Sequence, residues 1–277
     1  MKIGALIGFH TGTDIWKEFR KLRDLELDCC QINIWDVSLH TQENADMIRL
    51  AADTLGVEIT ALWGGWSGPA EWNFVYGPDT LGIVPPAYRW HRLQELESAS
   101  DFALKLGVTD VITHVGFLPE NPNDPNFVGT VAALRRLAGK MKERGQYFLF
   151  ETGQETPVTM LRAIEAIGTG NLGVNLDTAN LILYGKANTA DALDVFGKYV
   201  RNTHCKDGMY PTTGTELGME VPLGEGKANM PLVVKKLREL GYKGPLVIER
   251  EISGEKQTQD IIMARDLLRG ILKDLGE

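Results

Sequence analysis

Cysteine is scarce in this chain, which has only Cys29, Cys30 and Cys205. An odd number of cysteines, two of them adjacent, fits no disulfide framework and is typical of a protein in a reducing compartment. The chain also lacks an apolar run long enough to span a membrane. Its first apolar run is short and broken by Gly4, which is unlike a secretory signal. We therefore expect a cytoplasmic protein with no membrane partner.

Positive charge is also in deficit. The sequence has 29 lysines and arginines against 37 aspartates and glutamates, and its formal net charge is −8. A protein that binds the nucleic-acid backbone normally carries a basic stripe, so we expect no nucleic-acid partner. The 277 residues, 43% of them hydrophobic, suit one ordinary globular domain with a sizeable core.

Short apolar runs rich in β-forming residues alternate with longer segments of helical period. The predicted strands cover residues 3–9, 30–35, 58–63, 110–114, 147–151, 172–177, 200–204 and 246–249. The predicted helices cover residues 14–24, 44–55, 88–106, 128–143, 157–167, 190–196, 230–240 and 258–275. Glycines such as Gly56 and Gly107 end several helices. Eight strand–helix units predict an α/β fold, a (β/α)8 TIM barrel, formed as a single domain by residues 1–277.

Two longer segments, residues 64–86 and 207–227, interrupt this alternation. Both are rich in glycine and proline, and both follow the carboxyl end of a predicted strand. In a barrel these ends carry the active site. We therefore expect lids or substrate walls here, the alternative being insertions without a role.

Polar residues end four successive predicted strands that are otherwise apolar. They are Glu151, Asp177, His204 and Glu249. A carboxylate or imidazole at the end of a buried strand is costly unless something pairs with it. The first three are each about one strand–helix unit apart, and the segment 207–227 accounts for the longer last interval. Because strand side chains alternate, all four can point into the barrel mouth while Phe150, Leu176 and Ile248 face the helices.

Three carboxylates and one imidazole form a hard, oxygen-rich ligand set. This set predicts one divalent metal ion, with Mn²⁺ or Mg²⁺ favoured and Co²⁺ or Zn²⁺ as alternatives. It leaves coordination positions for water or substrate. The competing interpretation is a network of buried ion pairs without a metal.

Five fragments together resemble a known group of proteins. They are FETGQ (150–154), NLDTAN (175–180), HCKDG (204–208), PLGEG (222–226) and VIERE (247–251). In this order and spacing the chain is similar to the xylose isomerase-like TIM-barrel superfamily of sugar phosphate isomerases and epimerases. That group includes ketose 3-epimerases, hydroxypyruvate isomerases, inosose dehydratases and, more distantly, endonuclease IV.

The resemblance implies a catalytic role for two of the metal ligands. In the ketose epimerases, the glutamates that end the fifth and eighth strands bind metal and exchange the substrate proton, which implies these roles for Glu151 and Glu249. Removing a proton beside a carbonyl creates an enediolate, whose charge a metal stabilises as a Lewis acid. Two carboxylates on opposite sides of one carbon can then act as base and acid.

Two positions depart from the ketose epimerases and leave the particular sugar open. Asn180 stands where those enzymes have a histidine, and Lys206 and Asp207 stand where they have an arginine. The chain has only five histidines, and Trp63 and Asn180 occupy places where endonuclease IV would need further zinc ligands. A nuclease is therefore the weakest alternative.

Other polar and aromatic residues near the predicted strand ends are candidate substrate contacts. They are His10, Trp63, His114, Gln154, Asn180 and Lys206. For His10 and His114, ordinary packing is an equal alternative. Lys206 can hold a phosphate or polarise a carbonyl, or instead form an ion pair with Asp207 or Glu225.

The sequence thus predicts a metal-dependent isomerase or epimerase of a small sugar, sugar phosphate or polyol-ketone. An inosose-dehydratase-like lyase is the main alternative, because it would share the enediolate. A non-catalytic sugar-binding barrel would keep the pocket but show no proton exchange. The resemblance also implies a homo-oligomer, either a dimer or a tetramer.

Overall fold

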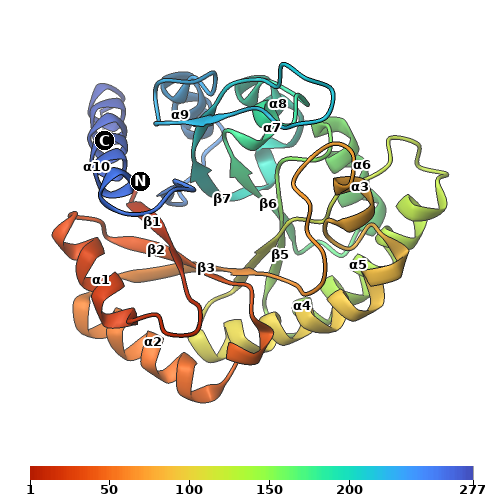
Figure 1. The fold of residues 1–277 in the computed structure, drawn as a ribbon, viewed down its shortest axis with the longest axis horizontal. Coiled ribbons are helices and arrows are strands. Elements are labelled where there is room, and N and C mark those ends of the chain that lie inside the picture. The colour runs from red at the N-terminus through yellow and green to blue at the C-terminus, as the bar shows by residue number, and fades with distance from the viewer. Residues whose placement is uncertain (277) are drawn as a thin grey trace.

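The computed structural model describes residues 1–276, and they form a closed barrel of parallel strands (Figure 1). The order around the barrel is β1-β10-β7-β6-β5-β4-β3-β2. The strands are β1 (Ile3–Gly8), β2 (Cys29–Ile34), β3 (Glu58–Gly64), β4 (Asp110–Thr113), β5 (Tyr147–Glu151), β6 (Leu172–Asp177), β7 (Val200–Cys205) and β10 (Leu246–Ile248). The predicted (β/α)8 TIM barrel is confirmed.

Helices surround this barrel and return the chain from each strand to the next (Figure 1). The long ones are α1 (Ile15–Asp24), α2 (Gln42–Leu55), α4 (Pro86–Leu106), α5 (Pro125–Glu143), α6 (Pro157–Ile167), α8 (Thr189–Phe196), α9 (Met230–Glu239) and α10 (Glu255–Asp274). The short elements are α3 (Gly77–Thr80), α7 (Asn180–Leu183), the 3-10 turns η1 (Val37–Leu39) and η2 (Gly197–Tyr199), and a small ribbon of β8 (Asp207–Gly208) and β9 (Glu220–Val221). None of the helices within residues 1–276 is long and apolar enough to cross a membrane.

Local sequence signals fix the helix ends. At the start of α2, the Thr41 side chain accepts a hydrogen bond from the backbone N–H of Asn44, which satisfies one of the free donors of the first turn. The same helix ends at Gly56, whose φ of 64° is the left-handed conformation that glycine adopts without steric cost. These caps explain why predicted and observed helices agree closely.

The strands separate two apolar layers. Phe150, Leu176 and Ile248 belong to the large cluster shared with helix residues, as the alternation predicts. A second cluster inside the barrel contains Ala61, Trp63, Ile112 and Leu149. The strand ends differ slightly from the prediction, because β4 stops at Thr113 and β10 at Ile248, where the last ladder partners lie. His114 and Glu249 therefore sit just beyond their strands.

The segment after β3 is held in place by one buried arginine of α4. The Arg92 guanidinium lies 4.1 Å from the centroid of the Trp66 ring and donates to backbone carbonyls along this segment. The acceptors are Ser67, Pro69, Thr80 and Gly82. Because these carbonyls would otherwise be unsatisfied, Arg92 fixes the path of the loop.

The segments after β3 and β7 meet beside the barrel mouth. The backbone N–H of Phe74 donates to the carbonyl of Thr215 (3.0 Å), and the Phe74 ring contacts that of Tyr184 edge-on. In Figure 1 the orange and cyan loops lie on the same side of the barrel. Both segments therefore form walls of the mouth.

Candidate active site

The polar residues predicted at four strand ends converge at the mouth of the barrel. Their strands β10, β7, β6 and β5 are neighbours in the barrel. Each residue offers one ligand atom, and these atoms lie within 4.8 Å of one another; the four residues are Glu151, Asp177, His204 and Glu249. Parallel strands in consecutive barrel positions thus bring together groups that are distant in the sequence.

The His204 imidazole lies at the centre of this cluster. Its Nδ1 is 2.8 Å from Glu151 Oε1 and 3.2 Å from Glu249 Oε2. Asp177 Oδ2 is further away, at 4.0 Å. The ring is fully buried. One nitrogen therefore faces all three carboxylates.

The two oxygens of Asp177 have different surroundings. Oδ1 accepts hydrogen bonds from the backbone N–H groups of Ala179 and Asn180, both at 2.8 Å. Oδ2 is buried without a hydrogen-bond partner and lies 3.5 Å from Lys206 Nζ. A carboxylate oxygen left in this way, beside an imidazole and two more carboxylates, fits a divalent cation. The donor set therefore suits the predicted metal.

The protein balances the charges of the cluster through shifted pKa values. Burial alone disfavours charge, and it raises the pKa of Asp177 well above its usual value. Burial also opposes ionisation of Glu249, but Lys206 and His204 outweigh it and hold the pKa of that carboxyl well below its usual value. Despite burial, the Glu249 and Glu151 carboxylates raise the pKa of His204 well above normal. Both raised pKa values favour the protonated forms of His204 and Asp177, which reduces the negative charge of the cluster.

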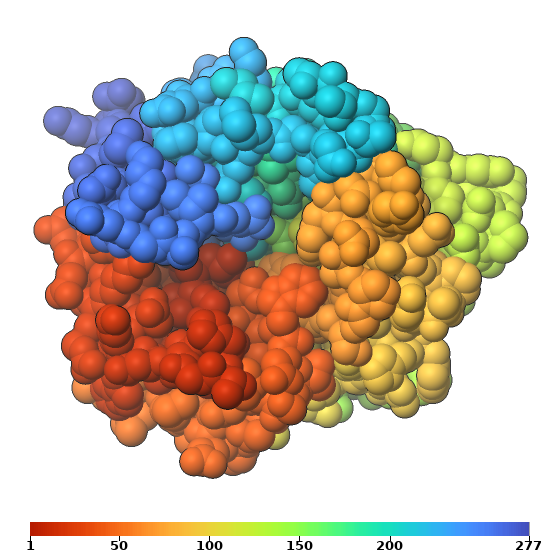
Figure 2. Space-filling view, in the orientation of Figure 1, coloured from red at the N-terminus to blue at the C-terminus, as the bar shows by residue number. Residues whose placement is uncertain are grey.

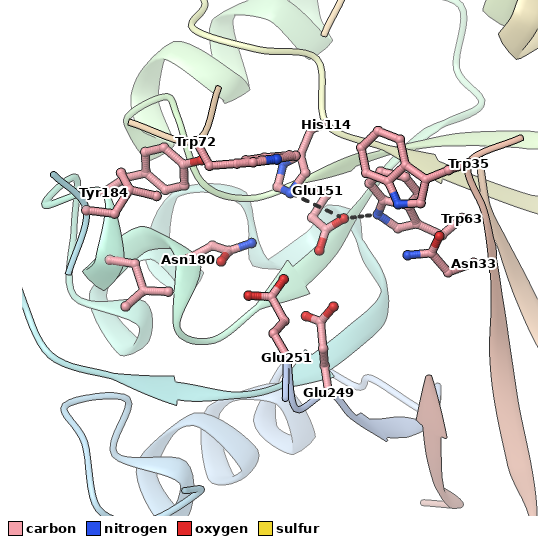
Figure 3. A pocket seen from close by; sticks show the side chains of 12 residues that line it. Asn33, Trp35, Trp63, Trp72, His114, Glu151, Asn180, Tyr184, Glu249 and Glu251 are labelled. Carbon is pink, nitrogen blue, oxygen red and sulfur yellow. Dashed lines mark hydrogen bonds and ion pairs between the residues drawn. The ribbon is translucent and has the colours of Figure 1, made fainter. Parts of the chain in front are cut away.

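Glu151 makes separate contacts with each of its oxygens. Oε1 faces His204, whereas Oε2 accepts a hydrogen bond from Trp63 Nε1 and lies 3.7 Å from His114 Nε2 (Figure 3). Burial lowers the pKa of His114, so this ring is neutral near neutral pH. Its Nδ1 is buried and has no hydrogen-bond partner. These contacts fix the direction in which the Glu151 carboxylate points.

Lys206 is buried among carboxylates. Its Nζ lies 3.3 Å from Glu249 Oε2 and 3.1 Å from Glu251 Oε2, in addition to the contact with Asp177. It also approaches Asn180 Oδ1 at 3.4 Å. The expected alternative, an ion pair with Asp207 or Glu225, is therefore wrong, because the lysine side chain turns into the mouth.

A cavity of about 350 Å³ opens above the cluster. Figure 2 shows the hollow near the centre of the molecule, between the orange, cyan and blue segments. The lining residues are Asn33, Trp35, Trp63, Trp72, His114, Glu151, Asn180, Leu183, Tyr184, Leu217, Glu249 and Glu251. Of the predicted substrate contacts, Trp63, His114 and Asn180 lie in this wall. The size suits a small organic ligand.

The other predicted contacts lie elsewhere. Gln154 is buried behind the wall, where its Nε2 donates to the Tyr184 hydroxyl (3.0 Å). His10 is exposed and does not belong to the residues that line this cavity. The reason is local: Phe9 packs into the core, and the His10 ring turns towards the carbonyl of Thr11.

Several wall residues were missed by the sequence analysis. Asn33 and Trp35 lie at the end of β2, and Trp72 and Tyr184 come from the loop after β3 and the turn after α7. Glu251 had a usable signal, since it follows Glu249 by two residues and points into the same cavity (Figure 3). The loop residues had none, because their positions depend on tertiary contacts.

A chain of hydrogen bonds inside the barrel orients the His204 ring. His204 Nε2 lies 2.7 Å from Gln31 Oε1, and Gln31 Nε2 donates to Asn202 Oδ1 (3.0 Å) and Asn175 Oδ1 (3.2 Å). Asn202 in turn donates to Asp110 Oδ2 (3.3 Å). A carboxylate only accepts, so each amide has one orientation and His204 Nε2 must carry a proton. Nδ1 then faces the carboxylates.

The fold and the site together define a class of protein, and comparisons agree with it. The family model described as xylose isomerase-like TIM barrel matches residues 19–270, and the chain belongs to this family. Solved structures with the same fold include sugar epimerases.

Three relatives illustrate the likeness. A xylose isomerase domain protein from Planctomyces limnophilus is 34% identical, with a TM-score of 0.92 over 99% of this chain and 98% of that one. D-psicose 3-epimerase from Clostridium cellulolyticum H10, solved with D-tagatose, is 16% identical, with a TM-score of 0.71 over 98% and 99%. A xylose isomerase-like TIM barrel protein from Mycobacterium smegmatis, in complex with magnesium, is 18% identical, with a TM-score of 0.72 over 99% and 97%.

One curated relative also matches by sequence. It is the uncharacterized protein MJ1311 of Methanocaldococcus jannaschii, which is 24% identical over 195 residues, 66% of this chain. The match spans 62% of the length of that relative. The description of this relative names no activity.

Proposed function

We propose that this protein is a divalent-metal-dependent isomerase or epimerase of a small sugar or polyol-ketone, acting through an enediolate. The observation that carries the proposal is the position of Glu151 and Glu249. Both contact the same His204 nitrogen from different strands, and both line one cavity of a size suited to a sugar. The epimerases among proteins of the same fold support this choice.

Glu151 and Glu249 exchange the substrate proton in this proposal. One carboxylate removes the proton from the carbon next to the carbonyl, and the other returns a proton to the opposite face of that carbon. The Trp63 indole and the neutral His114 ring hold Glu151 in place, and Lys206 holds Glu249. Return of the proton to a neighbouring carbon instead gives isomerisation.

The metal ligands in the proposal are Glu151, Asp177, His204 and Glu249. We favour Mn²⁺ or Mg²⁺, with Co²⁺ and Zn²⁺ as alternatives, because oxygen ligands dominate the set. A divalent cation here would stabilise the negative charge that develops on the substrate oxygen. Asp177 Oδ2 is buried without a hydrogen-bond partner, which supports this assignment. A cytoplasmic location is also part of the proposal, since all three cysteines are free thiols.

Incubation with Mn²⁺ and a panel of ketoses in deuterated water tests the proposal. An isomerase or epimerase incorporates solvent deuterium beside the carbonyl and gives a product of otherwise unchanged mass, which NMR and mass spectrometry detect. A dehydratase, the alternative enzyme, loses water in the same experiment. A lack of deuterium incorporation across the panel would contradict both, and would favour the non-catalytic binding barrel.

Gln31→Met is expected to weaken Mn²⁺ binding by roughly 10–100-fold, as loss of an orienting partner of a metal-bound histidine does. Methionine fills a similar volume but cannot accept the proton of His204 Nε2. Calorimetric titration of Mn²⁺ measures the effect. The control is Gln146→Met, which breaks two buried hydrogen bonds to Ser100 at the other end of the barrel. Equal metal affinities in the two variants would show that Gln31 has no orienting role.

A further inference from the structure

We propose that the substrate carries no phosphate and no other negative charge. This inference rests on the proposed function, because it concerns the same cavity and narrows the class of sugar that enters it. Three independent features of the mouth lead to it: the charge of the wall, the ion pairs of Lys206, and the hydrogen bonds of the backbone amides that would otherwise bind an anion.

The cavity wall is acidic. Its charged side chains are the carboxylates of Glu151, Glu249 and Glu251, and no lysine or arginine belongs to it among residues 1–276. Figure 3 shows Glu249 and Glu251 side by side, facing Glu151 across the cavity. A divalent cation would offset only part of this charge. A phosphate ester entering the cavity would therefore meet like charges that repel it.

Lys206, which contacts two carboxylates of the cavity wall, is already paired. Lys206 is 2% exposed, and its ammonium group is shared by Asp177, Glu249 and Glu251. Using it to bind phosphate would leave the carboxylates of Asp177 and Glu249 without this cation. Lys206 thus offsets only part of the negative charge beside the cavity and is not free to bind an anionic ligand.

The backbone amides after β7 are satisfied by the protein's own carboxylate. TIM barrels frequently bind phosphate through the loops after their last two barrel strands. Here the Asp207 carboxylate accepts four backbone hydrogen bonds of 2.9 to 3.0 Å, from the N–H groups of Gly208, Gly224, Gly226 and Ala228. A Cβ at Gly226 would come within 2.2 Å of Asp207 Oδ1, so the carboxylate fills this cradle. The place of a phosphate is occupied by Asp207.

The polar groups of the loop after β10 also have partners within the protein. Glu220 accepts a hydrogen bond from the backbone N–H of Glu251 (3.1 Å) and pairs with Arg250 (2.9 Å). Arg250 also pairs with Asp260 (2.9 Å) and so is directed away from the cavity. Neither this amide nor this guanidinium is available to an anion.

The rest of the wall suits a neutral sugar. Trp35 and Trp72 each keep 39% of their surface exposed and offer flat faces to the C–H groups of a sugar ring. Asn33 and Asn180 offer amide groups to hydroxyls. The acidic wall itself can accept hydrogen bonds from hydroxyl groups. A polyhydroxylated, uncharged ketone satisfies all of these groups.

The shift in melting temperature of the Mn²⁺-loaded protein on adding a sugar tests the inference. Two matched pairs of ligands are compared: D-fructose with D-fructose 6-phosphate, and D-tagatose with D-tagatose 6-phosphate. Ionic strength and the concentration of free Mn²⁺ are kept equal. The neutral sugars are expected to bind at least about tenfold more tightly than their phosphate esters, because the carboxylates of the cavity wall repel the phosphate group. Esters that bind as tightly as the sugars would overturn the inference, as would a lack of any shift with both neutral sugars. Deuterium exchange tests the proposed function separately. Exchange on the phosphate esters alone would refute this inference but support the proposed function. Binding of the neutral sugars without deuterium exchange would support this inference but contradict the proposed function.

A charge-reversed variant tests the physical cause. Glu251→Lys puts a cation in the wall at a position with a 60% exposed side chain. The variant is expected to improve the binding of D-fructose 6-phosphate relative to D-fructose by about tenfold or more. Glu165→Lys, on the exposed face of α6, makes the same change in net charge away from the cavity and should leave the ratio unchanged. If Glu251→Lys left the ratio of the two affinities, for D-fructose 6-phosphate and for D-fructose, unchanged, the proposed exclusion of anions by the acidic wall would be wrong.

Discussion

Glu249→Gln and Glu151→Gln are each expected to lower the rate of solvent deuterium exchange by roughly 10²–10⁴-fold, the usual contribution of a general acid or base. Glutamine keeps the shape and one acceptor oxygen of the side chain but cannot take up the substrate proton. Because both residues are also proposed metal ligands, metal content is measured in each variant. The comparison is made at saturating Mn²⁺, so that loss of metal and loss of proton transfer are separated.

Glu251→Gln is the matched control for these two variants. Glu251 lines the same cavity and pairs with the same Lys206, yet it does not belong to the cluster of proposed ligands. We expect this variant to change KM more than kcat, since Glu251 lines the cavity but is not one of the two carboxylates proposed to exchange the proton. If Glu249→Gln with bound metal exchanged deuterium as fast as Glu251→Gln, the proposed roles would be wrong.

Metal removal is expected to have the second largest effect. Chelation should abolish exchange, and Mn²⁺ at ~100 times its Kd should stabilise the folded protein by about 2.7 kcal/mol. Asp177→Asn should lose nearly all of this gain, because Oδ2 is the oxygen that faces the cluster. The metal-free stability of the variant should stay close to that of the metal-free parent, since burial already favours the protonated, neutral form of Asp177.

Differential scanning calorimetry with and without Mn²⁺ measures both quantities. Asp24→Asn, at the exposed end of α1, is the control and should keep the full gain in stability. An equal gain from Mn²⁺ in Asp177→Asn and in the parent would contradict the assignment of Asp177 as a ligand.

Metal affinity should also rise with pH. In the metal-free protein, the pKa values of His204 and Asp177 are both raised, which favours the protonated form of each group. A metal needs both in their deprotonated forms, and binding therefore releases protons. Lowering the pH restores those protons and weakens binding. Calorimetry in two buffers of different ionisation enthalpy counts the protons released, and a count of zero would disagree with this protonation state.

The barrel and the convergence of the four strand ends were predictable from the sequence. Glu151 and Asp177 end runs of apolar residues that must be buried, so a shared partner was the simplest way to satisfy them. The repeated strand–helix period then fixed the barrel, and with it the end at which these groups meet. Both inferences depend on local patterns that tertiary contacts do not override.

The partners of these residues were not predictable. Gln31 lies in the middle of β2 and contacts His204 only because the barrel closes, and Trp72 reaches the cavity only because Arg92 holds its loop. His10 follows β1 but does not line the cavity, because Phe9 is buried and His10 is exposed. Strand-end position predicts which side chains reach the mouth, whereas loop geometry decides which of them line the cavity.

A crystal structure grown with Mn²⁺, with anomalous scattering recorded at the manganese edge, tests the central claim most directly. The account predicts one anomalous peak about 2.0–2.4 Å from His204 Nδ1 and from an oxygen of each carboxylate. His204 Nε2 should keep its hydrogen bond to Gln31. The absence of a peak at saturating Mn²⁺, with His204 Nδ1 still bonded to Glu151, would show that the cluster is a network of ion pairs and contradict the proposed chemistry.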